Sequence, residues 1–193
     1  MKKDLIKPFY SSFLSCEKDT ETILRKLFVE DTRRAEELKR LLVINTRDCL
    51  DNRDSQVYKR VLEEMTLPKM VKEGYIRLKP KVVMPEHEEV KSYMIISYDH
   101  FTPNARNPKF RDCNINFDII CNDDAWELGD YRIRPLKIAG YVDGLLNESK
   151  LSGIGTLNFL TCKELLLDNE LNGYTLIYRA IHGSDDIIPS GEL

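Results

Sequence analysis

Apolar side chains in residues 1–74 recur every three or four positions, which is the spacing of helices that bury one face. Stripes of this kind begin near Asp19, near Thr32 and after Ser55, and aspartate and serine are common helix caps. A short fourth helix, opened by a proline, is expected to end at Gly74. The pattern predicts that residues 1–74 form a helical N-terminal segment.

After this segment the spacing changes to that of β-strands, and one strand is especially clear. Its apolar side chains occupy odd positions, with asparagine and aspartate between them: Cys113, Ile115, Phe117, Ile119 and Cys121. Alternation with a period of two predicts a strand with one face in the core and the other face hydrated. Both cysteines of this strand are therefore expected to be buried.

Neighbouring segments predict a sheet with one helix. Strands are expected over residues 75–84 and 90–98, where β-branched and aromatic residues are frequent. A helix is expected over residues 135–147. Within it, Gly140 and Gly144 lie four positions apart, which would let the helix backbone approach the sheet closely.

The C-terminal part of the sequence has the signature of a β-hairpin. Strands are expected over residues 155–167 and 173–182, and Asn172-Gly173 would end the reversal between them. The sequence therefore predicts an α+β fold: an N-terminal helical segment, then an antiparallel or mixed β-sheet with one packed helix and this hairpin. We expect the α+β domain to cover residues 75–187 and a flexible tail to cover residues 188–193.

Composition narrows the function classes. The 193 residues are 42% hydrophobic and 32% charged, with a net charge of −3, which fits a globular chain in water. There is no run of 18 apolar residues, and no apolar stretch follows the basic start, so we expect neither a membrane span nor a secretory signal. No basic stretch of the kind that binds nucleic acid is evident.

Motifs typical of catalytic or cofactor sites are missing from the sequence. It contains no glycine-rich phosphate loop and no GxSxG motif, and its five cysteines include no CxxC pair. We therefore expect no catalytic residues, no cofactor and no bound metal. The cysteines are expected to be reduced and buried.

One acidic, histidine-containing stretch leaves an alternative open. Glu86, His87 and Glu88, followed later by Asp99 and His100, carry side chains that bind divalent cations. If neighbouring strands brought them together, they would suit a metal-dependent, nuclease-like enzyme. The simpler interpretation, which we favour, is a hydrated acidic turn between two strands.

The single tryptophan, Trp126, has charged neighbours on both sides. Its ring would either anchor one end of the core or take part in an interface, and the sequence does not separate these roles.

The stretch from residue 110 to residue 186 resembles tail terminator and related head–tail joining (neck) proteins of tailed bacteriophages. The residues that carry the resemblance are FDIICN (117–122), Trp126, RPLKIAGYVDGLLN (134–147), GTLNF (155–159), LNGYTLIY (171–178) and HG (182–183). The first 74 residues lie outside it.

The resemblance implies a non-catalytic structural protein of the virion tail or neck, assembled in the host cytoplasm. Proteins of this kind form rings, typically hexamers, that cap the tail tube and offer a surface to head completion or connector proteins. DNA passes through the ring without specific binding. Residues 75–193 carry 13 basic and 18 acidic residues, which agrees with a channel that does not hold phosphates. The resemblance implies no membrane partner.

Two segments, over residues 101–110 and 123–131, are suitable arms for contacts between ring subunits. The candidate interface residues are Phe101, Arg106, Asp123, Asp124, Trp126, Tyr131 and His182. Because the N-terminal helices are outside the resemblance, two alternatives stay open: a different neck or adaptor protein, and a regulatory module whose helices bind another protein.

Overall fold

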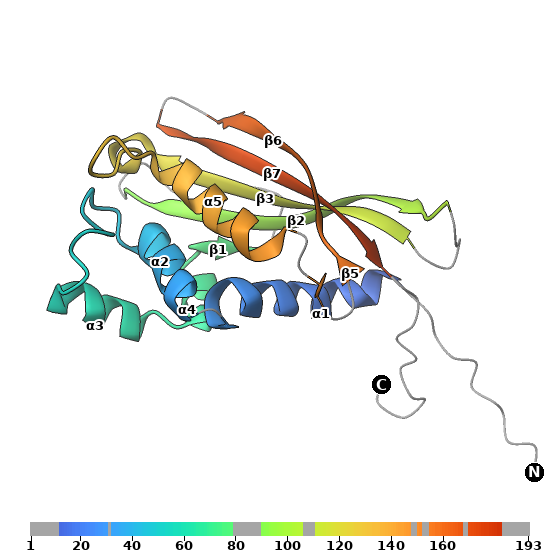
Figure 1. The fold of residues 1–193 in the computed structure, drawn as a ribbon, viewed down its shortest axis with the longest axis horizontal. Helices are drawn as coiled ribbons and strands as arrows, with labels where there is room; N and C mark the ends of the chain where they lie inside the picture. The colour runs from blue at the N-terminus through green and yellow to red at the C-terminus, as the bar shows by residue number, and fades with distance from the viewer. Residues whose placement is uncertain are drawn as a thin grey trace, which may run out of the picture.

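The computed structural model describes residues 12–30, 32–78, 90–105, 111–147, 150–151, 155–167 and 170–182. Helices come first along the chain and a sheet follows, with one more helix packed on that sheet (Figure 1). The predicted α+β fold is therefore confirmed.

The helical segment contains α1 (Ser12–Arg25), which continues into a π-helical turn, η1 (Lys26–Glu30), followed by α2 (Thr32–Val43), α3 (Gln56–Glu64) and α4 (Leu67–Lys72). Two predicted ends are confirmed. The Ser55 hydroxyl accepts a hydrogen bond from the Tyr58 amide at 3.4 Å, and Gly74 adopts the left-handed φ of +79° after α4.

The predicted start of the first helix is wrong, because α1 begins at Ser12 and Asp19 lies buried inside it. The hydroxyls of Thr20 and Thr22 donate back to the carbonyls of Cys16 and Lys18, four residues earlier. These polar side chains are satisfied within a helix and do not mark its beginning.

The main sheet has the strand order β1-β2-β3-β7-β6. Its strands are β1 (Ile76–Arg77), β2 (Ser92–Pro103), β3 (Arg111–Asn122), β6 (Asn158–Leu166) and β7 (Leu171–His182). The sheet is mixed, because β1 runs parallel to β2 while the other neighbours are antiparallel. The predicted C-terminal hairpin is confirmed as β6 and β7.

Four shorter or intervening elements complete the chain: a 3-10 turn η2 (Asp123–Ala125), helix α5 (Arg134–Leu146), and the small antiparallel pair of β4 (Lys150–Leu151) and β5 (Gly155–Thr156). None of the helices in the described part of the chain is long and apolar enough to cross a membrane.

Part of the segment over residues 101–110, expected to form an arm for subunit contacts, belongs to the sheet. Strand β2 continues to Pro103, which pairs with Arg111, after an irregularity in register between Asp99 and Thr102. The partner strand β3 begins at Arg111 and therefore offers a ladder to this end of β2. Residues 106–110 lie outside the described residues.

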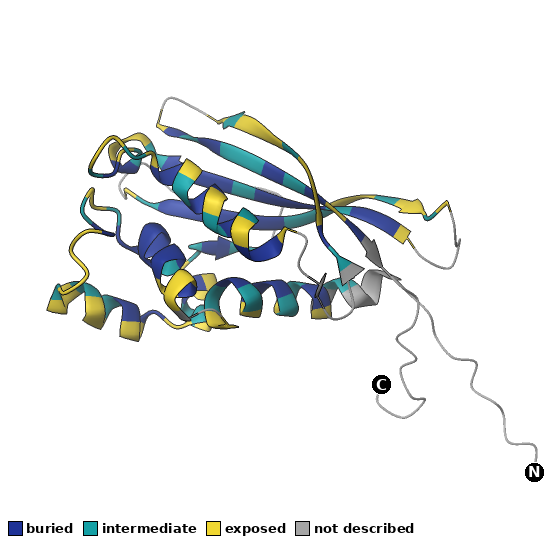
Figure 2. Ribbon diagram, in the orientation of Figure 1, coloured by how far each residue is buried: buried dark blue, intermediate teal, exposed yellow. Residues whose placement is uncertain are grey.

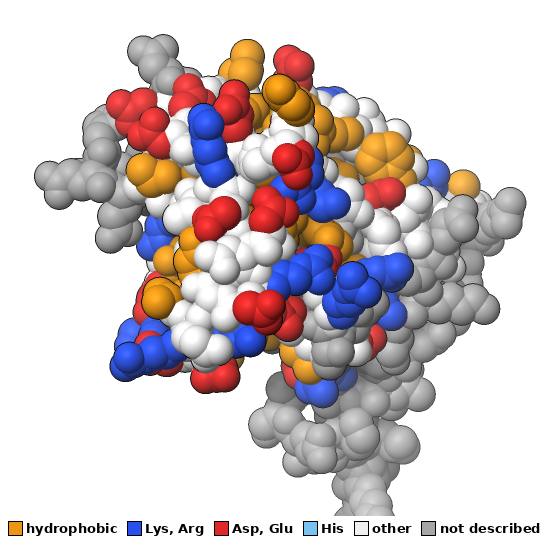
Figure 3. Space-filling view, turned by 60° about the vertical axis from the view of Figure 1, so that its left-hand side comes forward, with side chains coloured by type: hydrophobic (Ala, Val, Ile, Leu, Met, Phe, Trp, Pro, Cys, Tyr) orange, Lys and Arg blue, Asp and Glu red, His pale blue; other side chains and the backbone are white. Residues whose placement is uncertain are grey.

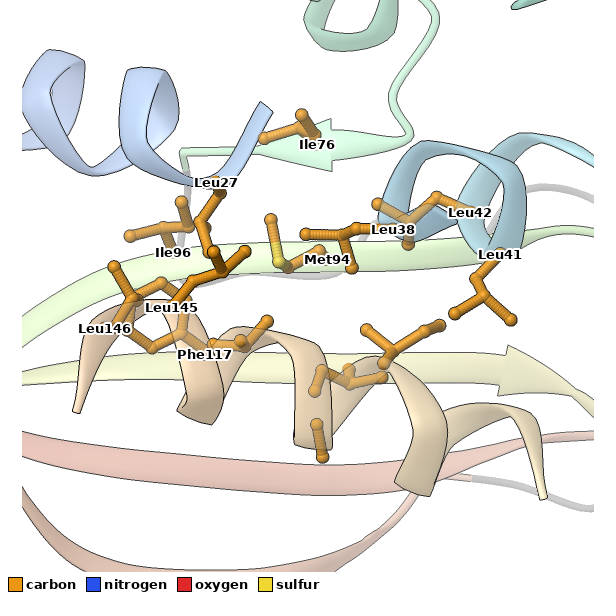
Figure 4. Close-up of a cluster of buried hydrophobic side chains, with 14 of the residues drawn as sticks. Leu27, Leu38, Leu41, Leu42, Ile76, Met94, Ile96, Phe117, Leu145 and Leu146 are labelled. Atoms are coloured by element: carbon orange, nitrogen blue, oxygen red, sulfur yellow. The ribbon is translucent and has the colours of Figure 1, made fainter. Parts of the chain in front are cut away.

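One core joins the helical segment to the sheet (Figure 4). Phe117 of β3 and Met94 and Ile96 of β2 point toward the helices, where η1, α2 and α5 contribute leucines. The labelled leucines are Leu27, Leu38, Leu41, Leu42, Leu145 and Leu146. The core thus extends across residue 74, and Cys113 and Cys121 lie within it as predicted.

The opposite face of β3 is more buried than the prediction of a hydrated face allows. Asn116 is 8% exposed and Ile120 is fully buried. Because β3 lies between β2 and β7, long side chains of its neighbours cover it, and Tyr93, Ile95 and Leu171 form a second apolar cluster with Ile120. Figure 2 shows the resulting contrast between the buried central strands and the exposed β6.

Gly173 lies inside β7 and not in the predicted turn. It pairs with Ile120 of β3 and Leu165 of β6. A Cβ atom on Gly173 would stand 1.7 Å from the Ile119 carbonyl oxygen, so close backbone packing explains this glycine.

Gly140 and Gly144 do not face the sheet, so that prediction is wrong as well. Both are exposed, and a Cβ atom on either would meet no atom within 4 Å. Helix α5 approaches the sheet through Ile138 and Val142, which are fully buried.

Candidate docking groove

The segment after β3 fixes two acidic side chains at one end of the sheet. The Asn122 side chain caps η2 by accepting from the Asp124 amide at 2.9 Å. The Asp123 amide donates to the Glu170 carbonyl at 2.8 Å, which ties η2 to the chain just before β7. Asp123 and Asp124 are both exposed there.

A tight loop follows η2 and carries Tyr131 at its tip. Glu127 and Ile133 form an isolated antiparallel bridge at its base. Asp130 and Tyr131 have φ angles of 58° and 59°, a region that bulky residues seldom adopt. Tyr131 is completely exposed.

Two ion pairs hold this loop against the connection between α2 and α3. The Arg132 guanidinium contacts both carboxylate oxygens of Asp51, at 2.6 and 2.7 Å. Arg47 contacts Glu127 at 2.8 Å, and the Arg47 carbonyl accepts from the Gly129 amide at 3.0 Å. The loop is therefore supported by the helical segment.

Arg134, at the start of α5, is fully buried and ties the same elements together from inside. Its guanidinium donates to four backbone carbonyl oxygens at 2.6 to 2.9 Å: those of Ala125, Leu41, Ile44 and Thr46. The carbonyls at the end of α2 carry the negative end of the helix dipole, which favours a cation. The sequence pattern marks Arg134 only as the start of a helix.

These elements border an open groove of about 560 Å³ between η2, its loop and the first residues of β7. Its acidic lining residues are Asp123, Asp124, Glu127 and Glu164, against one basic residue, Arg47. We call this surface the acidic groove. Figure 3 shows the end of the molecule where acidic side chains gather in the upper part of the view.

Three apolar or aromatic side chains also line the acidic groove, together with Asn172 and Gly173. The three are Trp126, Tyr174 and Leu166, and Leu166 is 77% exposed. The Trp126 and Tyr174 rings lie with centroids 6.4 Å apart. Trp126 also packs against the main core, so the two roles considered for it are compatible.

The groove continues onto β6, the outer strand of the sheet. Phe159 and Leu160 are 42% and 49% exposed, and Leu166 lies at the other end of the same strand. An outer strand with apolar, exposed side chains is a surface on which another chain can pair. Glu164 and Leu166 belong to both features, so groove and outer strand form one continuous surface.

The structure brings together three of the candidate interface residues, because Asp123, Asp124 and Trp126 all line the acidic groove. Tyr131 is on the neighbouring loop. The other described candidates, Phe101 and His182, lie near the opposite end of the sheet.

Phe101 is half-buried against the core, and His182 pairs with Arg111 at the end of β7. Arg106 is outside the described residues. That these residues form an interface stays a prediction.

The metal alternative can be followed for part of its residues. Glu86, His87 and Glu88 lie outside the described residues, whereas Asp99 and His100 are exposed near the far end of β2. The Asp99 carboxylate accepts a hydrogen bond from the Asn116 side-chain Nδ2 at 2.7 Å. No group of three or more histidine, cysteine or acidic side chains suited to a metal occurs among the residues placed by the structure.

The thiols differ from the prediction of burial at two positions, Cys16 and Cys162. Cys49, Cys113 and Cys121 are buried, and burial raises the pKa of Cys121 to about 11. Cys162 is exposed on β6, the strand at the edge of the sheet. Cys16 is half-buried.

The fold and the groove define an α+β protein with an open acidic groove at one end of a mixed sheet. The chain belongs to the YomW family, whose model matches residues 35–180. None of the curated proteins matches the chain. A solved chain in the virion of a native gene transfer agent (GTA) particle is 14% identical, covers 66% of this chain and 92% of its own, and superposes with a TM-score of 0.38.

Proposed function

We propose that this chain is a non-catalytic structural subunit of a phage head–tail junction, where copies form a ring that caps the tail tube and meets head completion or connector proteins. The observation that carries the proposal is the exposed apolar strand β6, continuous with the acidic groove. The resemblance of residues 110–186 to neck proteins supports it from the sequence.

An exposed apolar strand at the edge of a sheet exposes a protein to unwanted pairing with other chains. Natural proteins protect outer strands with charge, proline, bulges or a covering element, because an exposed apolar strand pairs with other chains. Strand β6 carries exposed Lys163 and Glu164 and an irregularity in register between Phe159 and Thr161, yet it still exposes Phe159, Leu160 and Leu166. Such a surface is expected in a subunit that works in an assembly.

A ring needs two different surfaces that fit each other on every subunit. The acidic groove and β6 supply one of them at one end of the sheet. The resemblance favours a hexamer in the neck of the virion, with DNA passing through the channel without specific binding. Under this proposal the chain needs neither a cofactor nor a membrane partner.

Imaging with tail tubes tests the proposal. Negative-stain images of the chain, alone and mixed with tail tubes, should show rings at tube ends, and the added chain should stop tube growth. Leu166→Lys should abolish capping, because it replaces the most exposed apolar side chain of β6 with a charged one. Val57→Lys is the matched control, since Val57 is 69% exposed on α3. Tubes that grow unchanged in excess wild-type chain would contradict the proposed function.

A further inference from the structure

We propose that residues 1–11 of one copy dock in the acidic groove of the next copy. The inference deepens the proposed function, since it names the contact between subunits, and it rests on the chain assembling with itself. Its starting point is the groove, whose described lining has four acidic side chains and one arginine.

The arginine of the groove does not offset the remaining acids. Arg47 is paired with Glu127 at 2.8 Å, which leaves Asp123, Asp124 and Glu164 facing the opening. The Asp123 carboxylate accepts a long hydrogen bond, at 3.4 Å, from the side-chain Nδ2 of Asn172. A partner that carries lysines would therefore gain attraction from three carboxylates, while a neutral or acidic partner would not.

The apolar lining sets a second requirement. Trp126, Tyr174 and Leu166 offer a surface for aliphatic or aromatic side chains, and interfaces of this type are anchored by such residues. The occupant should thus combine basic and apolar side chains within a short stretch.

Residues 1–11 have this composition. Their sequence, MKKDLIKPFYS, contains three lysines and one aspartate, with Leu5, Ile6, Phe9 and Tyr10 among them. The match to the groove is one of charge and of side-chain type, and both surfaces belong to the same chain.

Reach favours a groove on another copy. The Thr20 hydroxyl contacts the Tyr98 hydroxyl at 2.9 Å. In the sheet, Tyr98 pairs with Ile115, and Ile115 pairs with Tyr178 of β7, so Thr20 lies level with Tyr178. From there α1 runs toward Ser12, away from the end of the sheet where β7 begins (Figure 1).

The groove at residues 172–174 lies about 20 Å from Tyr178 along the strand. Ser12 lies about 12 Å beyond Thr20 in the opposite direction. Eleven residues span at most about 40 Å when fully extended. The first residues alone could therefore reach the groove of the same copy, while Phe9 and Tyr10 could not.

Charge reversal in the full-length chain tests the inference. Lys2→Glu/Lys3→Glu/Lys7→Glu reverses the charge of residues 1–11, and Asp123→Lys/Asp124→Lys reverses the charge of the acidic groove. Each should raise the dissociation constant for self-association about tenfold or more, measured by sedimentation velocity. An equimolar mixture of the two variants should restore association, because residues 1–11 of each variant can then dock in a groove of opposite charge on the other variant. Asp54→Lys/Glu63→Lys, two exposed acids outside the groove, is the control.

Trp126 reports occupancy directly, because it is the single tryptophan of the chain. Its emission should shift with wild-type concentration and with an added peptide of residues 1–11, and groove reversal should remove both shifts. Rings that persist when Lys2, Lys3 and Lys7 are all replaced by glutamate would overturn the inference and leave the proposed function standing. Conversely, charge-swap rescue without capping of tail tubes would support this contact and contradict the proposed function.

Discussion

Removing the Arg134 guanidinium should destabilise the protein more than any surface change. Arg134→Met keeps most of the side-chain volume and removes donors to the carbonyls of Ala125, Leu41, Ile44 and Thr46. Each hydrogen bond contributes about 1 kcal/mol net, and a carbonyl left buried without a donor costs about 1–3 kcal/mol.

The loss is offset in part, because methionine does not need to bury a charge. We expect the free energy of unfolding to fall by about 3–5 kcal/mol, which is a large share of the 5–15 kcal/mol typical of a domain. Arg134→Lys should retain part of this stability, since an ammonium group can reach some of the carbonyls but not all of them.

Urea unfolding followed by Trp126 fluorescence measures the effect, and Trp126 is close, since its carbonyl accepts from the Arg134 amide at 2.8 Å. Arg60→Met is the matched control. Arg60 is 81% exposed and pairs with Glu64 one turn away, so its loss should cost at most about 0.5 kcal/mol. If the free energy of unfolding of Arg134→Met lay within about 1 kcal/mol of the wild-type value, at an unchanged m-value, the stabilising role given to the Arg134 guanidinium would be refuted.

Three further outcomes follow from the geometry. Gly173→Ala should lower the free energy of unfolding in urea by more than about 2 kcal/mol, because the new Cβ meets a β3 carbonyl. Gly140→Ala should raise it by about 0.5–1 kcal/mol, because the new Cβ has open space around it. Equal effects of the two substitutions would contradict both assignments. Burial raises the pKa of Asp118, so its ionisation opposes folding. Asp118→Asn should therefore stabilise the chain at pH 7, and the gain should shrink as the pH falls from the raised pKa toward the ordinary carboxyl range and vanish below that range. Maleimide should label Cys162 before Cys121, and a Cys162→Ser chain that kept the fast phase would disprove this order.

Periodicity predicts elements well where one face alone is buried. Helix α2 and the odd positions of β3 follow their patterns closely, because each packs one side against the shared core. The even positions of β3 depart from the pattern. Asn116 is buried by strands that are distant in sequence, and alternation within one strand carries no information about its neighbours.

Glycines show a second limit of sequence patterns. Asn172-Gly173 is typical of a turn, yet Gly173 is needed where β7 approaches β3, and that approach is defined only once the strands are paired. The spacing of Gly140 and Gly144 is equally compatible with a buried or an exposed helix face. The choice depends on the side of α5 that carries Ile138 and Val142.

Part of the candidate site was accessible from the sequence. The charged neighbours of Trp126 indicate a surface position, and Asp123 and Asp124 do line the same groove. Glu164 and Tyr174 come from β6 and β7 and join the groove only through the fold. No local signal distinguishes Arg134 from an ordinary helix-starting residue, because its partners lie up to 93 positions away in the chain.

The core that crosses residue 74 makes the N-terminal helices indispensable to the sheet. A fragment starting at residue 75 would present Met94 and Ile96 to water, because it lacks the leucines of η1 and α2 that lie near them in Figure 4. Exposing a side chain of this size to water lowers the free energy of unfolding by about 1.5–3 kcal/mol. The helices and strands should therefore melt in a single transition, and deletions meant to isolate the C-terminal half should yield insoluble protein.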